Sequence, residues 1–286
     1  MKHVDEYGPR LRQVGRGLKV VYTDLDNTLL GPDASLFLGP DRRYSLEPAR
    51  ALVALLSAGV EVTPVSGRNN AQLHELARLT GLRSYIAELG CLIFYEQGRE
   101  VFANHDFPVP EGWNLRQAVA DSGAPALLLD SYDGRLEYHT PWSEKQECTH
   151  LFRGLIDVEK ANKLLAQNGF SGLRLVDNGR CRSSDTLARL PETHAYHLLP
   201  RKAGKASAIR ADQKRRGLSP KETVAFGDSL ADLEMAEAVG SFFLVRNDIS
   251  ADPALTSALG DYSNVYSTTN SMGVGWAEAV SLLLAE

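Results

Sequence analysis

Short apolar runs of strand length alternate with helix-like segments in the first third of the chain, and the alternation returns near its other end. The runs expected to be strands start at residue 20 and lie at 60–65, 84–89, 223–226 and 241–245. The helices expected between them follow Ser45, span 70–80 and 204–216, and extend to about residue 239. The first is expected to turn Ala49, Leu52, Val53 and Leu56 toward the core, and glycines at 59, 81, 217 and 240 are expected to end the four helices. Such alternation requires right-handed crossovers between parallel strands, so the predicted fold class is α/β, a parallel sheet with helices on both faces.

Two acidic side chains end the first apolar run, VVYTDLDNTLL at residues 20–30. Side chains alternate along an extended chain, so Asp24 and Asp26 face one side while Leu25 points away. Two unit charges roughly 4 Å apart repel by ~4 kcal/mol at an intermediate dielectric unless a cation or a shared proton relieves them. The pair indicates a reaction centre, although Asp, Asn and Thr in this segment equally suit a turn or a helix cap.

Three further segments place polar side chains at the ends of expected elements: VTPVSGRN, AGKASAIRADQKRRG and TVAFGDSLADLEM. The candidate site residues in these segments, in chain order, are Ser66, Gly67, Arg68, Lys205, Asp228 and Asp232. Ligands of open parallel sheets bind beyond the carboxyl ends of the strands. Asp24, Ser66 and Asp228 are therefore expected to lie at one edge of the sheet.

In this order, the four segments resemble the signature motifs of the haloacid dehalogenase superfamily: D-x-D-x-T, a Ser or Thr, a Lys, and G-D-x-x-x-D. The resemblance covers roughly residues 18–90 and 197–250. The stretch between them is too long for a connection and resembles the large α/β cap of the sugar-phosphatase branch. That branch includes Cof-like, sucrose-phosphate and mannosyl-3-phosphoglycerate phosphatases, and HLLPRKAGKASAI at 197–209 is similar to its approach to the lysine.

The resemblance implies a Rossmann-like catalytic core interrupted by a cap that acts as a lid. We expect a polar lead-in at 1–17, the core at 18–89 and 198–286, and an α/β cap at 90–197 that selects the substrate. The elements expected in the cap are a strand at 99–103, a helix beginning near Trp113, a buried strand at 126–130, a helix at 157–168, and strands near 172–176 and 195–199.

The family mechanism implies a role for each matching residue. Asp24 would attack phosphorus to form an aspartyl-phosphate, and Asp26 would protonate the leaving oxygen and then deprotonate the hydrolytic water. Ser66 and Lys205 would hold the phosphoryl oxygens. Mg²⁺ is the implied cofactor, because hard oxygen ligands suit it. Its ligands would be Asp24, Asp228 and the main-chain carbonyl of Asp26, with Asp232 acting through water, while Thr28 braces the loop.

Other polar residues have a binding and a structural interpretation. Gly67 and Arg68 extend the candidate phosphate site, although Arg68 can equally pair with an acid. In the cap, Arg180, Arg182 and His197 are candidates for contact with a polar substrate. The aromatic side chains Trp113, Tyr132 and Trp142, together with His139, can stack on a sugar ring or simply pack; packing is favoured for each aromatic.

Three positions depart from the family pattern. Ala231 precedes the last acid where many relatives have Asn or Asp, which removes a possible hydrogen bond near the metal. Leu89 replaces a common Asn before a glycine, and Ala206 follows the lysine where glycine is frequent. None of the three changes the nucleophile or the direct metal acid, so activity is expected.

Charge, hydrophobic runs and cysteine content bear on the binding partners and on the location of the protein. The net charge of −5, from 31 basic and 36 acidic side chains, argues against a general nucleic-acid binder. No apolar run approaches a membrane span, and the first 17 residues lack the apolar centre of a signal peptide. Three widely spaced cysteines, Cys91, Cys148 and Cys181, suit a reducing cytosol, so a cytoplasmic location is expected. The oligomeric state is undetermined.

The sequence thus predicts a Mg²⁺-dependent phosphatase that hydrolyses a small phosphorylated sugar or sugar acid. A sugar phosphomutase of the same fold is an alternative, because capped relatives also move phosphoryl groups between hydroxyls. A second alternative is a protein that binds a sugar phosphate without turnover, motivated by Ala231 and Leu89.

Overall fold

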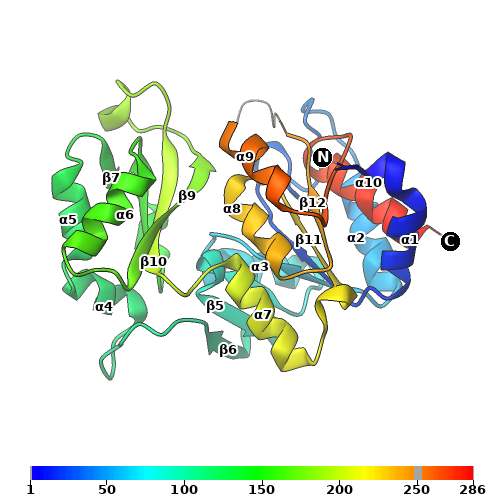
Figure 1. Cartoon of the computed structure of the whole chain (residues 1–286), viewed down its shortest axis with the longest axis horizontal. Helices are drawn as coiled ribbons and strands as arrows, with labels where there is room; N and C mark the ends of the chain where they lie inside the picture. The colour runs from blue at the N-terminus through cyan, green and yellow to red at the C-terminus, as the bar shows by residue number, and fades with distance from the viewer. Residues whose placement is uncertain (1, 248–252, 286) are drawn as a thin grey trace.

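A computed structural model describes residues 2–247 and 253–285. Figure 1 shows two parts joined by extended chain: a large part that holds both termini, and a smaller part drawn in green. We call the smaller part, residues 104–204 between strand β6 and helix α7, the insert. The larger part is the core.

The core is built on a six-stranded sheet in which every neighbouring pair of strands is parallel. In spatial order its strands are β1 (Lys2–His3), β13 (Val265–Ser267), β12 (Ser241–Leu244), β11 (Thr223–Gly227), β2 (Val20–Thr23) and β3 (Glu61–Pro64). The predicted parallel α/β sheet is confirmed. Strands β11 and β2, which precede the acids, are adjacent in this order, and neither is an edge strand.

Helices cover both faces of this sheet because its strands are apolar on both sides. On β2, Val21 joins one buried cluster while Val20 and Tyr22 join the other. The first cluster packs beneath α1 (Gly8–Arg16), α2 (Glu47–Ser57) and α10 (Met272–Leu284); the second packs beneath α7 (Lys205–Arg216), α8 (Leu230–Leu233) and α9 (Pro253–Ala258).

A second, three-stranded antiparallel sheet adjoins the core. Its strands are β4 (Tyr85–Ala87), β5 (Leu92–Tyr95) and β6 (Glu100–Ala103), and α3 (Asn70–Thr80) precedes it. The expected strand at 99–103 is confirmed as β6, but it pairs with β5, and Glu100 forms an ion pair with Arg215 of α7. These strands therefore lie against the core.

The insert contains a four-stranded antiparallel sheet covered by three helices. In spatial order the strands are β7 (Leu136–Tyr138), β8 (His150–Gly154), β10 (His194–Pro200) and β9 (Leu173–Arg180), and the helices are α4 (Leu115–Asp121), α5 (Ala124–Ser131) and α6 (Val158–Gln167). In Figure 1, β9 is the insert strand nearest the core.

Glycine signals located several helix ends correctly. Helix α3 begins with a capping box between Asn69 and Gln72 and ends before Gly81, whose φ is 74°. Helix α7 ends before Gly217, whose φ is 66°. Glycine is favoured at both positions because it adopts the left-handed conformation without a steric cost.

The expectation of a buried strand at 126–130 was wrong, because these residues form the middle of helix α5. A continuous apolar run does not distinguish a buried strand from a buried helix. The helix begins after Gly123, which has a positive φ, and carries Pro125 in its first turn, a position where proline fits.

Two helices of the core differ from their expected form. In α2 the buried side chains include Ala51, Leu52 and Leu55, whereas Val53 is 60% exposed. The helix expected to reach residue 239 is the short α8 followed by a 3₁₀ helix, Glu234–Glu237. The expected lead-in at 1–17 holds β1 and α1, to which the sequence analysis assigned no structure.

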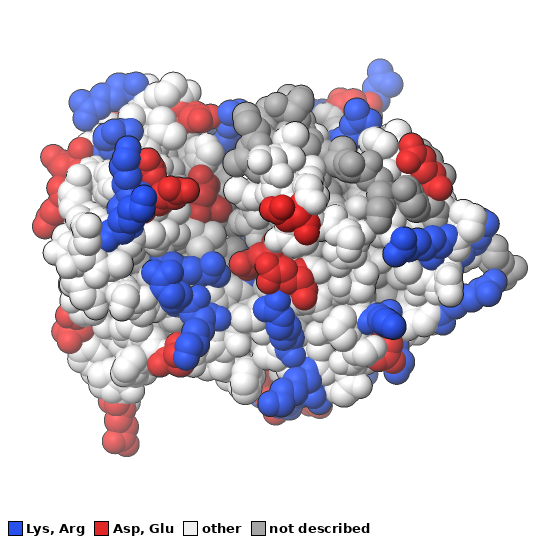
Figure 2. All heavy atoms as spheres, viewed as in Figure 1, with Lys and Arg blue, Asp and Glu red and all other residues white. Residues whose placement is uncertain are grey.

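Two further features of the described residues concern helix length and surface charge. Between residues 2 and 285, apart from the gap at 248–252, no helix is long and apolar enough to cross a membrane. Figure 2 shows acidic and basic side chains interspersed on the face it displays.

The aromatic cluster under α10 yields a stability prediction. Phe226 is fully buried, with its ring 4.8 Å from that of Phe243 and 5.5 Å from that of Trp276. Phe226→Ala should lower the free energy of unfolding by about 3–5 kcal/mol, because the substitution removes these contacts and leaves a cavity. Urea unfolding measures this, with Tyr44→Ala as the control, because Tyr44 is 87% exposed. A loss below about 1 kcal/mol for Phe226→Ala would contradict the described packing.

Candidate active site

The carboxyl ends of β2 and β11 bring two predicted site residues together. Asp24 follows β2 directly, and its backbone N–H donates to the carbonyl of Phe226 at 2.9 Å. Asp228 follows β11 in the same way. Because these strands are parallel neighbours, both carboxyl groups lie at one edge of the sheet.

Lys205 connects acids of the first and fourth motif segments. Its ammonium group donates to Asp24 Oδ1 at 2.7 Å and to Asp232 Oδ1 at 2.5 Å, and all three side chains are at least nine-tenths buried. Lys205 is the first residue of α7, where the helix dipole disfavours a cation, so the two carboxylates hold it there. The acid pair with this lysine forms one buried ionic cluster.

Asp232 also shapes the loop after β11. Its Oδ2 accepts hydrogen bonds from the backbone of Asp228 at 3.2 Å and from the backbone and hydroxyl of Ser229 at 3.1 and 2.7 Å. A side chain at Gly227 would clash, because a Cβ there would lie 2.2 Å from Asp232 Cβ. The G-D-x-x-x-D pattern therefore has a steric as well as a chemical basis.

Asp228 has two hydrogen-bond donors of its own. Thr28 Oγ1 donates to Oδ1 at 3.2 Å, consistent with the bracing role expected for Thr28. Asn247 Nδ2 donates to Oδ2 at 2.9 Å and also to the carbonyl of Asn27 at 2.8 Å. The sequence analysis missed Asn247; its signal is a polar residue just beyond the apolar run at 241–245. It supplies Asp228 with a side-chain hydrogen bond despite Ala231.

The pKa values of the three buried acids are shifted strongly by burial and by one another's charges. Burial raises the pKa of Asp24 to about 7, with the charges of Asp232 and Asp26 adding to it and Lys205 opposing it. Burial and the charges of Asp232 and Asp24 raise the pKa of Asp228 well above its usual range. Burial also acts on Asp232, but Lys205 and its hydrogen bonds outweigh it and lower the pKa of Asp232. One buried cation leaves this cluster with excess negative charge.

The donor set fits a divalent cation. Asp24, Asp228 and Asp232 each offer a carboxylate oxygen, and these atoms lie within 4.8 Å of one another. Hard oxygen ligands of this kind suit Mg²⁺. The raised pKa values of Asp24 and Asp228 indicate that additional positive charge would be favourable here.

Asp26 and Arg68 form a second pair at the rim of the cluster. Arg68 Nε donates to Asp26 Oδ2 at 2.9 Å and Nη2 donates to Oδ1 at 2.6 Å. The Asp26 side chain is 51% exposed, so it faces the open side of the site. Pairing with an acid, one of the two interpretations of Arg68, is thus what this structure shows.

Ser66 lies at the carboxyl end of β3, beside β2. The preceding residue, Val65, donates from its N–H to the carbonyl of Thr23 at 2.8 Å. Ser66 is buried, and its hydroxyl accepts from the N–H of Arg68 at 3.3 Å. Gly67, between them, lies close to two side chains of the insert, Asn178 and His197.

The remaining residues proposed for the cap are not brought into this cluster. Arg180 ends β9, is 70% exposed and forms an ion pair with Glu192 at 2.7 Å. Arg182 is exposed two residues further on. Trp113 and Trp142 are 43% and 49% exposed, whereas Tyr132 packs against the buried cluster. These observations leave the substrate contacts of the cap as predictions.

Leu89 occupies a special backbone position. It and Glu88 have φ values of 55° and 50°, in the left-handed region, which costs a non-glycine residue about 1–2 kcal/mol. Asn tolerates this conformation better than Leu. At this turn the Leu89 side chain is buried in the core, and the Glu88 side chain contacts the insert.

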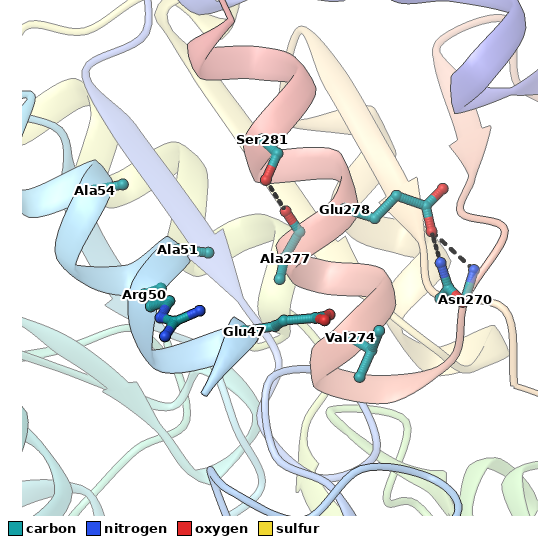
Figure 3. Close-up of a pocket in the computed structure, with 9 residues that line it drawn as sticks. All are labelled: Glu47, Arg50, Ala51, Ala54, Asn270, Val274, Ala277, Glu278 and Ser281. Atoms are coloured by element: carbon teal, nitrogen blue, oxygen red, sulfur yellow. Dashed lines mark hydrogen bonds between the residues drawn. The ribbon is translucent and has the colours of Figure 1, made fainter. Parts of the chain in front are cut away.

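Two open cavities lie away from the acids. One, of about 360 Å³, lies between α2 and α10 and is lined by residues including Arg50, Val274 and Glu278, as Figure 3 shows. The other, of about 470 Å³, is lined by residues of the insert from Arg180 to Thr193. Neither is lined by a residue of the acid cluster.

Comparison with known proteins agrees with this geometry. A sequence family described as haloacid dehalogenase-like hydrolase matches residues 186–275, which include Lys205, Asp228 and Asp232. These matches support a place for the chain in the haloacid dehalogenase superfamily. It is 25% identical to phosphoglycolate phosphatase 1 of Saccharolobus solfataricus, over 93% of this chain and 96% of that protein. It is 25% identical to the HMP-PP phosphatase of Klebsiella pneumoniae, over 80% and 84%.

Solved structures share the whole architecture. The sucrose-phosphatase of Synechocystis, in complex with sucrose and phosphate, has a TM-score of 0.64 at 18% identity and covers 93% of this chain and 97% of that one. A haloacid dehalogenase-like hydrolase from Bacteroides thetaiotaomicron has a TM-score of 0.59 at 15% identity, covering 92% and 98%. At these identities the likeness shows the fold. With the named relatives, it supports a phosphatase of this superfamily.

The raised pKa of Asp24 predicts a pH-dependent stability. The folded protein holds a proton on Asp24 up to about pH 7, whereas the unfolded chain releases it near pH 4. The folded state thus binds more protons near neutrality, and its free energy of unfolding falls as pH rises from about 6 to 8. With a chelator present, Asp24 should account for a fall of about 1 kcal/mol in the free energy of unfolding over this pH range. The Asp24→Asn variant should lack this contribution.

Urea unfolding of both proteins at pH 6 and 8 measures it, because titrating groups outside the acid cluster cancel in the difference between them. Asp33→Asn is the control: Asp33 forms a surface ion pair with Arg42, and the difference from the parent protein should not change with pH. An Asp24→Asn difference that is equal at both pH values would contradict the assignment.

Proposed function

We propose that this protein is a Mg²⁺-dependent phosphatase that hydrolyses a phosphate monoester of a small metabolite through an aspartyl-phosphate on Asp24. The observation that carries the proposal is the buried cluster of Asp24, Lys205 and Asp232 beside Asp228. A phosphate monoester resists uncatalysed hydrolysis so strongly that several cooperating groups are required. This cluster offers a nucleophile, a cation for the phosphoryl oxygens, and carboxylates suited to a metal.

In the first step, an Asp24 oxygen attacks phosphorus while the bond from phosphorus to the leaving oxygen breaks. Asp26 gives a proton to that oxygen, which leaves as an alcohol. In the second step, water attacks phosphorus, its proton passes to Asp26, and the bond from Asp24 to phosphorus breaks. Lys205 and Ser66 hold the phosphoryl oxygens throughout.

Arg68 has a part in this sequence. In this structure its guanidinium group donates to both oxygens of Asp26. A phosphate monoester carries negative oxygens that match a guanidinium group equally well. Substrate entry would therefore draw Arg68 away from Asp26 and free that carboxyl group for proton transfer, which unites the two interpretations of Arg68.

Asp24, Asp228 and Asp232 would hold the Mg²⁺, with the carbonyl of Asp26. When bound, the ion supplies positive charge that relieves repulsion among these carboxylates and opposes the negative charge of the phosphoryl group. Asn247 and Thr28 orient Asp228 for this task.

The insert, as a cap, would choose the substrate and exclude water. Phosphoglycolate and sucrose phosphate are the substrate chemistries suggested by the names of the relatives and of the structural neighbour. Phosphomutase activity would require that the phosphoryl group return to a second hydroxyl. A non-catalytic binder is the weakest of the three, because the acid pair, the lysine and the distal acids of the motifs are all present.

The proposal predicts that Asp24→Asn lowers phosphate release about 10³-fold or more, because an amide is a poor nucleophile. Release from a panel of sugar phosphates, phosphoglycolate and p-nitrophenyl phosphate measures this, and chelator should abolish it reversibly. Asp33→Asn, on an exposed loop, is the matched control and should remain active. Metal-independent release, or full activity of Asp24→Asn, would contradict the proposal, and formation of a phosphorylated isomer would favour the mutase.

A further inference from the structure

Two polar side chains of the insert meet the loop that carries Ser66. A methyl group on Gly67 would lie 2.9 Å from Asn178 Nδ2 and 3.0 Å from His197 Nε2. Asn178 belongs to β9 and His197 to the adjacent strand β10. Both side chains therefore reach from the insert to the residue that follows the proposed phosphate-binding hydroxyl.

His197 is buried but has one nitrogen available. Its side chain belongs to a residue that is 1% exposed, and Nδ1 lies 3.0 Å from Thr149 Oγ1. No residue within 2–247 or 253–285 forms a hydrogen bond with Nε2. Nε2 is not fully enclosed, and it lies beside Gly67 where the insert meets the core, so a ligand bound there could supply its missing hydrogen bond.

Glu88 determines which nitrogen of His197 carries the proton. Its buried carboxylate accepts from the backbone N–H groups of Glu147, Cys148 and Thr149 at 2.7, 2.9 and 2.7 Å. Thr149 Oγ1 donates its single proton to Glu88 Oε2 at 3.2 Å. The hydroxyl is therefore an acceptor toward His197, so Nδ1 carries the hydrogen and Nε2 presents a lone pair.

The amide of Gln146 supports this orientation. In the orientation that satisfies both of its polar atoms, its nitrogen donates to Glu88 Oε1 and Oε2 at 3.2 and 3.0 Å. Every contact of Glu88 is then with a donor. Burial raises the pKa of Glu88, and these hydrogen bonds counteract the rise by favouring the ionised form.

The His197 ring is neutral at physiological pH. Burial lowers the pKa of His197 to about 3, and the positive charge of Lys205 and the neighbouring His139 act in the same direction. A neutral ring protonated on Nδ1 accepts a hydrogen bond through Nε2 and offers no charge to an anion.

We propose that His197 and Asn178 recognise a hydroxyl group of the substrate next to its phosphate ester. His197 Nε2 accepts the hydroxyl proton, and Asn178 Nδ2 donates to the hydroxyl oxygen. This inference rests on the proposed function and narrows its substrate class to hydroxylated phosphate esters. A carboxylate at the same place has no proton to donate near neutrality. The acceptor Nε2 would then face an oxygen that cannot donate a hydrogen bond to it.

The test compares kcat/KM for 2-hydroxyethyl phosphate and ethyl phosphate, which differ by one hydroxyl group, with phosphoglycolate as a third substrate. The parent protein should prefer the hydroxylated ester by about tenfold or more, the expected effect of an unpaired buried acceptor. His197→Leu should reduce this ratio toward one. Thr149→Val should also reduce it by releasing the ring, whereas Thr149→Ser keeps the hydroxyl and should keep the ratio.

His150→Leu is the matched control. His150 is equally buried in the neighbouring strand β8, and both of its nitrogens have partners, Tyr138 and the carbonyl of Arg116. Its substitution should leave the ratio unchanged. Nitrogen-15 NMR of the His197 ring provides a readout without turnover: it should show the Nδ1-protonated tautomer in the parent and in Thr149→Ser, and a changed tautomer in Thr149→Val.

Each outcome decides the inference. A parent ratio near one, a ratio retained by His197→Leu and Thr149→Val, or a preference for phosphoglycolate over both esters would overturn it while leaving the phosphatase proposal intact. An Nε2-protonated ring in the parent would also overturn it. Absence of release from all three substrates and from p-nitrophenyl phosphate would overturn the proposed function, and this inference with it.

Discussion

The ion pairs of Lys205 with Asp24 and Asp232 are the interaction on which the site depends. They join the end of β2, the start of α7 and the loop after β11, and they keep a lysine at a helix N-terminus that would otherwise repel it. Burial alone would lower the pKa of Lys205, but the charges of Asp232 and Asp24 raise it, so the lysine is held as a cation. The remaining negative charge would attract a divalent cation, which would in turn offset the negative charge of a phosphoryl group.

The parts of the fold that sequence predicted best are those with a local physical signal. Gly81 and Gly217 located helix ends, and the apolar runs before Asp24 and Asp228 located the central strands, since these runs are buried on both faces. The run at 126–130 failed because the same residues satisfy a buried helix. Asn247 was missed because its role exists only once β12 is placed beside β11, an arrangement that no local pattern records.

Contacts between insert and core explain why the two parts can act together. Glu88 extends from the core turn at Leu89 and takes three backbone N–H groups of the insert. Arg174 of β9 lies 3.6 Å from Glu234, whose other oxygen accepts from the N–H of Lys205 at 2.8 Å. The insert is thus tied to the residues that flank the acid cluster.

The central claim is that Asp24 takes the phosphoryl group, and reduction of the trapped enzyme tests it most directly. The protein would be mixed with Mg²⁺ and a substrate it turns over, quenched in acid, treated with borohydride and digested for mass spectrometry. An aspartyl-phosphate is reduced to homoserine, so the account predicts homoserine at position 24, dependent on substrate. Phosphate release with no modification at Asp24, or with modification of a different residue, would contradict it.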